Sequence, residues 1–190
     1  MTSDEALMLE FQGGSRAAFE ELFARYRKPL HGFFRRRLNN PERAEDLIQE
    51  TFLAVIRAAS RYEPRASVRT YLYGIAFKLL AAERRKFLTS STSGQSAPEP
   101  RTGGTPECGL WVRQAMEKLD APEREILMLR EYEQLSYSDI AELLRIPVNT
   151  VRSRLFRSRL ALKSYLDSDA KNPALRASPG QPHPGRRGMQ

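Results

Sequence analysis

The sequence SYSDIAELLRIPVNTVRSRLFRSR, from Ser136 to Arg159, decides the fold of this chain. Ser136 and Asp139 have the spacing of a capping box, in which a hydroxyl and a carboxylate bond free backbone N–H groups at a helix start. The short helix that follows is broken at Arg145, and Pro147 can open the next helix because its missing N–H donor costs nothing there. The stretch therefore predicts two helices joined by a tight turn.

The second of these helices has an apolar face and a polar, basic face. Val148, Val151, Leu155 and Leu162 recur at helical spacing and predict the buried side. The other side carries Asn149, Thr150, Arg152, Ser153, Arg154, Phe156 and Arg157. Because this face holds no acidic partners, the pattern favours a DNA-reading helix-turn-helix over a helical hairpin with a solvated basic face.

Composition restricts the class of protein. The chain has 190 residues, 41% of them hydrophobic, and a net charge of +8, which suggests a polyanionic partner. No apolar run approaches the roughly 20 residues that span a bilayer, and from the acidic N-terminus we expect no signal peptide. A single cysteine, Cys108, and two distant histidines predict neither a disulfide nor a metal site, so we expect a cytoplasmic protein.

Between residues 88 and 108 the composition changes, and 14 of 21 residues are Ser, Thr, Gly or Pro. Such a segment predicts a flexible linker with a root-mean-square reach of roughly 25 Å. We therefore expect a helical domain over 1–87, the linker over 88–108, a helix-turn-helix domain over 109–167 and a disordered basic tail over 168–190. The second domain has 10 basic and 9 acidic residues, so its basic last helix indicates a directed DNA face.

Helical periodicity makes the whole chain all-α. The first domain is predicted to contain helices over Ser3–Gln12, Ser15–Leu38 with a kink or break at Pro29, Pro41–Ala59 and Val68–Lys86. The second is predicted to add a helix from about Leu110 to Leu119 and another that Asp120 caps. No phosphate-binding glycine loop or nucleophile elbow is present, so no enzyme, cofactor or metal is expected.

Two surfaces of the first domain remain ambiguous from the residues alone. The helix from Pro41 exposes an acidic strip, Glu45, Asp46, Gln49 and Glu50, which is either a solvated face or a docking face for a basic protein. From Tyr62 to Lys86, cations alternate with aromatic side chains, as a single-stranded nucleic-acid site requires. The alternative for these aromatics is that most belong to the core.

Several motifs, in this order, resemble bacterial sigma factors of the extracytoplasmic-function group. They are AEDLIQETFLAVIR (Ala44–Arg57), RTYLYGIA (Arg69–Ala76) and LDAPEREILMLREYEQLSYSDIAELLRIPVNTVRSRLFRSR (Leu119–Arg159). The resemblance covers about Ala17 to Leu166. It extends to what the chain lacks, because a linker alone replaces the extra domains of housekeeping sigma factors.

The resemblance implies a non-enzymatic subunit that binds core RNA polymerase, recognises the −35 and −10 promoter elements and promotes DNA melting. Its implied partners are promoter DNA, as duplex at −35 and as a single strand at −10, and an anti-sigma factor, often membrane-bound, that can hold the chain at the membrane. The chain would be monomeric on polymerase and would not itself insert into a membrane.

The resemblance also assigns residues to three sets. The docking set, for core polymerase, is Glu45, Asp46, Leu47, Gln49 and Glu50. The −10 set is Tyr62, Arg65, Arg69, Thr70, Tyr71, Tyr73, Lys78, Arg84 and Arg85. The −35 set is Asn149, Thr150, Arg152, Ser153, Arg154, Phe156, Arg157 and Arg159. In the −10 set, a base extruded from the stack would be captured by the loop Ser60–Arg69.

The chain departs from the family pattern in ways that leave its −10 preference and the geometry of its turn open. Phe77-Lys78 stands where Arg-Asn is usual, Ala82 where Asp is common, Tyr71 where Trp is common, and Arg145 and Pro147 where Gly and Ser are usual.

Two other classes compete with a sigma factor. One is an autonomous dimeric helix-turn-helix regulator, disfavoured by the long linker and by the lack of an evident dimerisation helix. The other is a sigma mimic that only sequesters a regulator. Tight duplex binding by the chain alone would indicate the autonomous regulator, and a holoenzyme that never opens a promoter would indicate the mimic.

Overall fold

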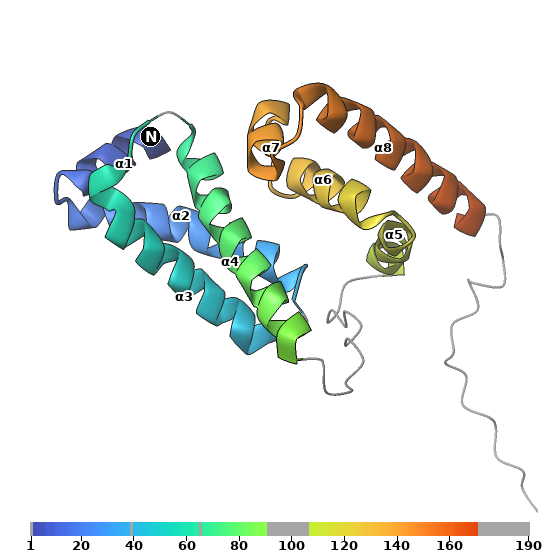
Figure 1. Ribbon diagram of the computed structural model, residues 1–190, viewed down its shortest axis with the longest axis horizontal. Helices are drawn as coiled ribbons and strands as arrows, with labels where there is room; N and C mark the ends of the chain where they lie inside the picture. The colour runs from blue at the N-terminus through green and yellow to red at the C-terminus, as the bar shows by residue number, and fades with distance from the viewer. Residues whose placement is uncertain (1, 39, 65, 91–106, 171–190) are drawn as a thin grey trace, which may run out of the picture.

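The computed structural model describes residues 2–38, 40–64, 66–90 and 107–170, and all regular structure in these ranges is helical. This confirms the all-α prediction. The elements in chain order are α1 (Asp4–Gln12), α2 (Arg16–Arg35), α3 (Pro41–Ala58), the 3-10 turn η1 (Ala59–Arg61), α4 (Val68–Ser90), α5 (Glu107–Glu117), α6 (Ala121–Glu131), α7 (Tyr137–Leu144) and α8 (Val148–Ala170). Figure 1 shows α1–α4 gathered on one side and α5–α8 on the other.

The first domain is built from α1 to α4. Polar side chains cap its first three helices: Ser3 and Ser15 accept from backbone N–H groups three residues on, and Asn40 Oδ1 accepts from Arg43 N at 3.1 Å. Helix α3 packs against both α2 and α4. Helix α2 continues through Pro29, so of the predicted kink or break the break is excluded. The helix persists because packing of its apolar face offsets the one backbone hydrogen bond that proline removes.

The second domain packs α5, α6 and α7 against the long helix α8. Its fully buried apolar side chains come from these helices and from the turn before α7: Ala115, Ile126, Leu129, Leu135, Ile140, Val151 and Leu155. Asp120 occupies the N-cap position of α6, but its side chain makes no capping hydrogen bond. The predicted capping role of that carboxylate is therefore wrong.

Three helices run past their predicted ends. Helix α4 continues to Ser90, α5 begins at Glu107, and α8 continues to Ala170. Residues 88–90 and 107–108, assigned to the linker, and residues 168–170, assigned to the tail, are therefore helical. None of these linker and tail residues is a proline or glycine, and Gly109, in the N-terminal extension of α5, costs only about 1 kcal/mol, so a helix that tertiary packing has already nucleated can continue through them. The rest of the linker and of the tail lies outside the described residues.

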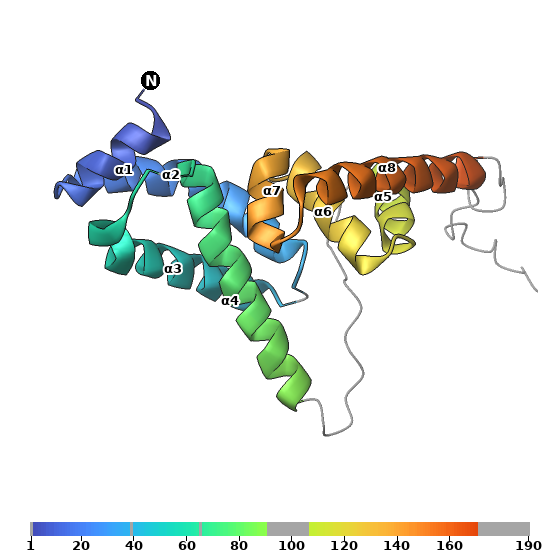
Figure 2. The same ribbon diagram turned by 45° about the horizontal axis from the view of Figure 1, so that its top comes forward.

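The two domains touch. Helix α7 contacts α4, and Figures 1 and 2 both show it between α4 and the rest of the second domain. Side chains at the C-terminal end of α2 also bond to the turn between α6 and α7. The sequence does not predict this contact between the domains, because the residues that form it in each domain are scattered along the chain and make no motif.

Candidate nucleic-acid interface

The turn between α7 and α8 has the geometry that its sequence predicts. Ser136 Oγ accepts from Asp139 N at 3.1 Å, and Asp139 Oδ2 accepts from Ser136 N at 3.0 Å, which confirms the capping box. Helix α7 ends at Leu144 and is capped by Arg145, whose φ of 54° is left-handed. Ile146 N donates back to Ala141 O at 3.0 Å, and Arg145 N donates to Glu142 O at 3.2 Å. These two bonds form a Schellman motif, which sets the angle at which α8 leaves the turn.

Helix α8 presents the −35 set to solvent. Asn149, Arg152, Ser153, Phe156, Arg157 and Arg159 are exposed, and Thr150 and Arg154 are half-buried. Phe156 is 69% exposed, an unusual position for a phenylalanine. Behind this face, Val151 and Leu155 are buried, and Leu162 lies half-buried against the same core.

Two arginines of this face do have acidic partners, which the sequence of α8 alone did not reveal. Arg157 Nε lies 3.3 Å from Glu123 Oε1, and Arg159 Nη2 lies 2.6 Å from Glu131 Oε1. Both carboxylates belong to α6. The bond to Glu131 raises the pKa of Arg159 above its ordinary value. The Arg157 side chain is 60% exposed and that of Arg159 is 48% exposed, so either arginine can exchange its carboxylate for a DNA phosphate or base at small cost.

The aromatics of the −10 set divide into core and surface. Tyr73 is 1% exposed and packs on Phe33, with ring centroids 5.5 Å apart. Tyr62 is 5% exposed and packs against Tyr71 at 5.3 Å. Burial raises the pKa of all three tyrosines, and for Tyr73 the nearby Glu133 carboxylate adds to the effect. In this state Tyr73 and Tyr62 are packed into the core, which is the alternative that the sequence left open, although Tyr62 also borders the cavity beside Tyr71.

The remaining members of the −10 set lie along one side of α4. Thr70, half-buried Tyr71 and exposed Lys78 border a cavity of about 570 Å³. Arg84 and Arg85 are exposed nearer the C-terminal end of α4. Arg65 lies outside the described residues. The structure thus aligns cations and an aromatic ring on one helix, as a single strand would need.

Arg69 of the −10 set has another partner. One of its guanidinium N–H groups donates to the backbone oxygen of Glu133 in the second domain at 3.2 Å. Its guanidinium also lies 5.8 Å from the centre of the Tyr26 ring.

The docking set on α3 is partly neutralised and needs one correction. Arg43 Nη1 lies 2.8 Å from Glu50 Oε1 and 3.5 Å from Asp46 Oδ2, and His31 lies 3.2 Å from Glu45. Leu47, which the resemblance placed in the docking set, is 1% exposed. It faces the core because it lies one residue from the exposed Asp46, about 100° around the helix.

Sequence reasoning missed two apolar members of this surface. Leu53 is 47% exposed and Ile56 is 45% exposed. Residues 46, 49, 53 and 56 follow helical spacing, so Asp46, Gln49, Leu53 and Ile56 form one stripe along α3. That spacing is the sequence signal for this stripe, and the acidic strip predicted from the sequence covers only its polar end.

Within the described part of the chain, no group of three or more His, Cys, Asp or Glu residues could hold a metal ion. Over the same residues, no helix combines the length and apolar content that crossing a bilayer requires.

Comparison with known proteins identifies both halves of the chain. The family described as sigma-70 region 2 matches residues 22–86, and the family described as sigma-70, region 4 matches residues 109–162. The RNA polymerase sigma-H factor of Pseudomonas aeruginosa is 32% identical over 181 residues, covering 86% of this chain and 93% of that protein. The ECF RNA polymerase sigma-E factor of Haemophilus influenzae is 31% identical, covering 86% and 95%.

Two solved structures share the fold. CnrH, in complex with the cytosolic domain of CnrY, superposes with a TM-score of 0.64 at 23% identity over 88% of this chain and 99% of that one. The sigma factor RpoE of Bartonella quintana, in complex with the anti-sigma factor NepR, has the same TM-score at 22% identity over 80% and 98%. With two family regions in the expected order and relatives matched over almost their full length, the chain belongs to the extracytoplasmic-function sigma factors, which act in transcription initiation by RNA polymerase.

Proposed function

We propose that this sigma factor docks on core polymerase through the stripe on α3 and reads promoter DNA with its other two surfaces, acting without catalysis of its own. In this proposal residues 1–87 form the docking and −10 domain, and residues 109–167 form the −35 domain. The observation that carries it is the exposed basic face of α8, held at a defined angle by the capped turn before it.

The −35 reading is supported by the size and chemistry of that face. An α-helix fits the major groove, where arginine can bond guanine and an apolar side chain can contact the thymine methyl group. Arg152 and Arg157, exposed on either side of Phe156, provide both kinds of contact. Asn149, Arg154 and Arg159 would then lie nearer the phosphates, where they would hold the helix in register.

The −10 reading depends on α4 and the loop before it. Lys78, Arg84 and Arg85 would hold the phosphates of the separated strand, and Tyr71 is the aromatic ring best placed to stack on a base. Extruding a base costs unstacking energy, which contacts to the single strand would offset, so recognition and melting would be one process. Tyr62 and Tyr73 would support this surface from beneath.

Docking would combine charge with apolar burial. The stripe on α3 offers Asp46 and Gln49 at one end and Leu53 and Ile56 at the other. Such a surface fits a basic partner with an apolar centre, the usual composition of a protein interface core and rim. Polymerase is the proposed partner, and an anti-sigma factor, as in the RpoE–NepR complex, is the proposed regulator of the chain in the cytoplasm.

The test is co-elution of the purified chain with core RNA polymerase, followed by selection of DNA with that complex. We expect a stoichiometric complex and selected sequences with two separated elements. Leu53→Asp should weaken the complex, whereas Leu9→Asp, at an equally exposed leucine on α1, should not. Tight duplex binding without polymerase, and no complex with it, would refute the proposal and favour an autonomous regulator.

A further inference from the structure

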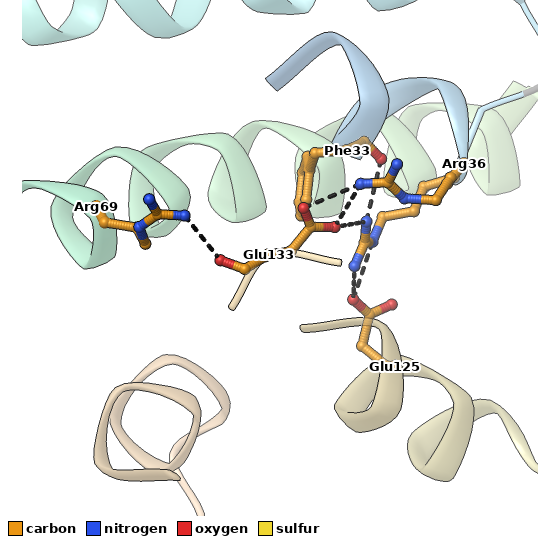
Figure 3. A network of polar contacts seen from close by, with 6 residues as sticks. Phe33, Arg36, Arg69, Glu125 and Glu133 are labelled. Atoms are coloured by element: carbon orange, nitrogen blue, oxygen red, sulfur yellow. Dashed lines mark hydrogen bonds and ion pairs between the residues drawn. The ribbon is translucent and has the colours of Figure 1, made fainter. Parts of the chain in front are cut away.

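A buried ionic cluster joins the two domains. Arg37 Nη1 at the end of α2 donates to Glu133 Oε1 at 2.9 Å, and Arg36 Nη2 donates to both oxygens of the same carboxylate at 3.0 Å (Figure 3). Arg37 Nε also donates to Glu125 Oε1 at 3.0 Å. The side chains of Arg37 and Glu133 are each only 1% exposed, so these charges have left water entirely.

Further contacts surround the cluster from both domains. The Arg36 guanidinium lies 4.5 Å from the centre of the Tyr132 ring, and Arg69 of α4 donates to the Glu133 backbone oxygen. Three arginines of the first domain therefore converge on one residue of the second. Figure 3 shows Arg36 and Arg69 approaching Glu133 from different helices. The resemblance to sigma factors assigns no role to Arg36, Arg37 or Glu133.

The energetics of this ionic cluster allow the two domains to separate. Attraction between buried charges is largely offset by the loss of their hydration, so a buried ion pair adds little net stability while intact. Removing one partner is much more costly, because the other charge stays buried alone. In addition, Arg36 Nε is buried without a hydrogen-bond partner among the described residues, whereas Arg37 Nη2 forms an ion pair with Glu125 at 2.9 Å. Water would satisfy Arg36 Nε if the domains parted.

The closed arrangement conflicts with simultaneous reading of two promoter elements. Leu143 and Arg145 of the second domain border the same cavity as Tyr71 and Lys78 of α4. Residues 149–157 follow Arg145 by at most 12 positions, so the −35 face lies within roughly 30 Å of the −10 face. The elements themselves are about 25 base pairs apart, or roughly 85 Å of duplex.

We propose that the cluster of Arg36, Arg37, Glu125 and Glu133 is a latch that holds the free sigma factor closed, with α7 over the −10 face of α4, and that the latch must open before the chain can engage a promoter. The need to open rests on the proposed function above. The closed state itself rests only on the contacts between the domains, so the two can be tested separately.

The test measures the radius of gyration of the full chain by small-angle X-ray scattering, without polymerase or DNA. The variants are Arg37→Glu, Glu133→Arg and a fourfold reversal, Arg36→Glu with Arg37→Glu, Glu125→Arg and Glu133→Arg. Each single reversal places like charges in contact, and the fourfold reversal restores an opposite pair at each of the three contacts that join Arg36 and Arg37 to the two carboxylates. We expect each single variant to expand by roughly 1.3-fold relative to wild type, and the fourfold variant to return toward the wild-type value.

Controls separate opening from unfolding. Arg16→Glu makes the same charge change at an exposed pair on α2 and should leave the radius unchanged. Glu133→Gln keeps the side-chain shape but removes its charge, and it should expand the chain with unchanged helix content by circular dichroism. A wild-type chain that is already expanded, or charge-altered variants that stay as compact as wild type, would overturn the latch. Failure to co-elute with polymerase would count against the proposed function alone.

Discussion

Replacing Arg145 by glycine should stabilise the helix-turn-helix. Arg145 is the residue that ends α7, and its φ of 54° and ψ of 47° put it in the left-handed region. Its N–H donates to Ala141 O and Glu142 O, so the conformation is held by hydrogen bonds and not by the guanidinium group. Glycine adopts this conformation without the steric conflict that a Cβ atom creates.

The size of the effect follows from two opposing terms. A non-glycine residue in the left-handed region costs roughly 1–2 kcal/mol, which Arg145→Gly would relieve. Glycine also gains freedom in the unfolded chain, which returns about 0.5–1 kcal/mol. The net expectation is a gain of about 0.5–1 kcal/mol in the free energy of unfolding. For a domain of this size that corresponds to an increase in Tm of about 2–8 °C.

Trp111 makes this gain measurable. It is the only tryptophan of the chain and lies half-buried on α5, in the same domain as the turn. A thermal melt followed by tryptophan fluorescence therefore reports on the second domain, even when the first unfolds at another temperature. The reading face of α8 is unchanged in this variant, so affinity of the holoenzyme for −35 DNA should stay within about twofold of wild type.

Arg145→Ala is the matched control. It removes the same guanidinium from the cavity between the domains but keeps the Cβ atom, so the backbone conflict remains. We expect Arg145→Ala to show no increase in Tm. If alanine raised Tm as much as glycine, or if glycine lowered it, the conformational argument would be refuted and the arginine side chain would be the cause.

Three further predictions concern the surfaces and their charges. Asp46→Lys with Glu50→Lys should weaken co-elution with core polymerase without changing helix content; undiminished co-elution would exclude this face from docking. Arg157→Ala should cost about 1–3 kcal/mol at one −35 base pair and relax specificity there, whereas equal losses on all −35 sequences would make Arg157 a backbone contact. The bond from Arg43 holds the pKa of Glu83 below its ordinary value of 4.5, so its stabilising contribution is complete above that pH and is lost as pH falls through the folded-state pKa. Glu83→Gln should therefore flatten the acid limb of stability measured by urea denaturation, and an unchanged acid limb would contradict this assignment.

Local signals predicted most of the elements. The capping box at Ser136 and the Asn40-Pro41 start are confirmed because each depends on residues a few positions apart. The exposed face of α8 was predictable for the same reason, since helical spacing alone decides which side chains share a face. Helix ends were less accurate, as α4 and α5 show, because packing extends helices beyond their periodic core.

The incorrect predictions concern which face of each helix is buried by the rest of the chain. Tyr73 and Leu47 carry the residue types expected of a reading or docking surface, but both are buried. Ile56 is an apolar residue, yet no element of the described chain covers it fully. Helical periodicity orders side chains around a helix without showing which neighbours approach it. That information is carried by contacts between segments distant in the sequence.

By itself, the sequence determined the all-α class, the helix-turn-helix, the family and the basic face of α8, because these depend on short-range spacing and on the motifs around it. Only the tertiary structure decided which tyrosines are core, which arginines of α8 have carboxylate partners, and that Arg37 meets Glu133 across the two domains. The physical reason is that a charge or a ring has no fixed role until burial and partners are known. Those partners lie up to 97 residues away along the chain.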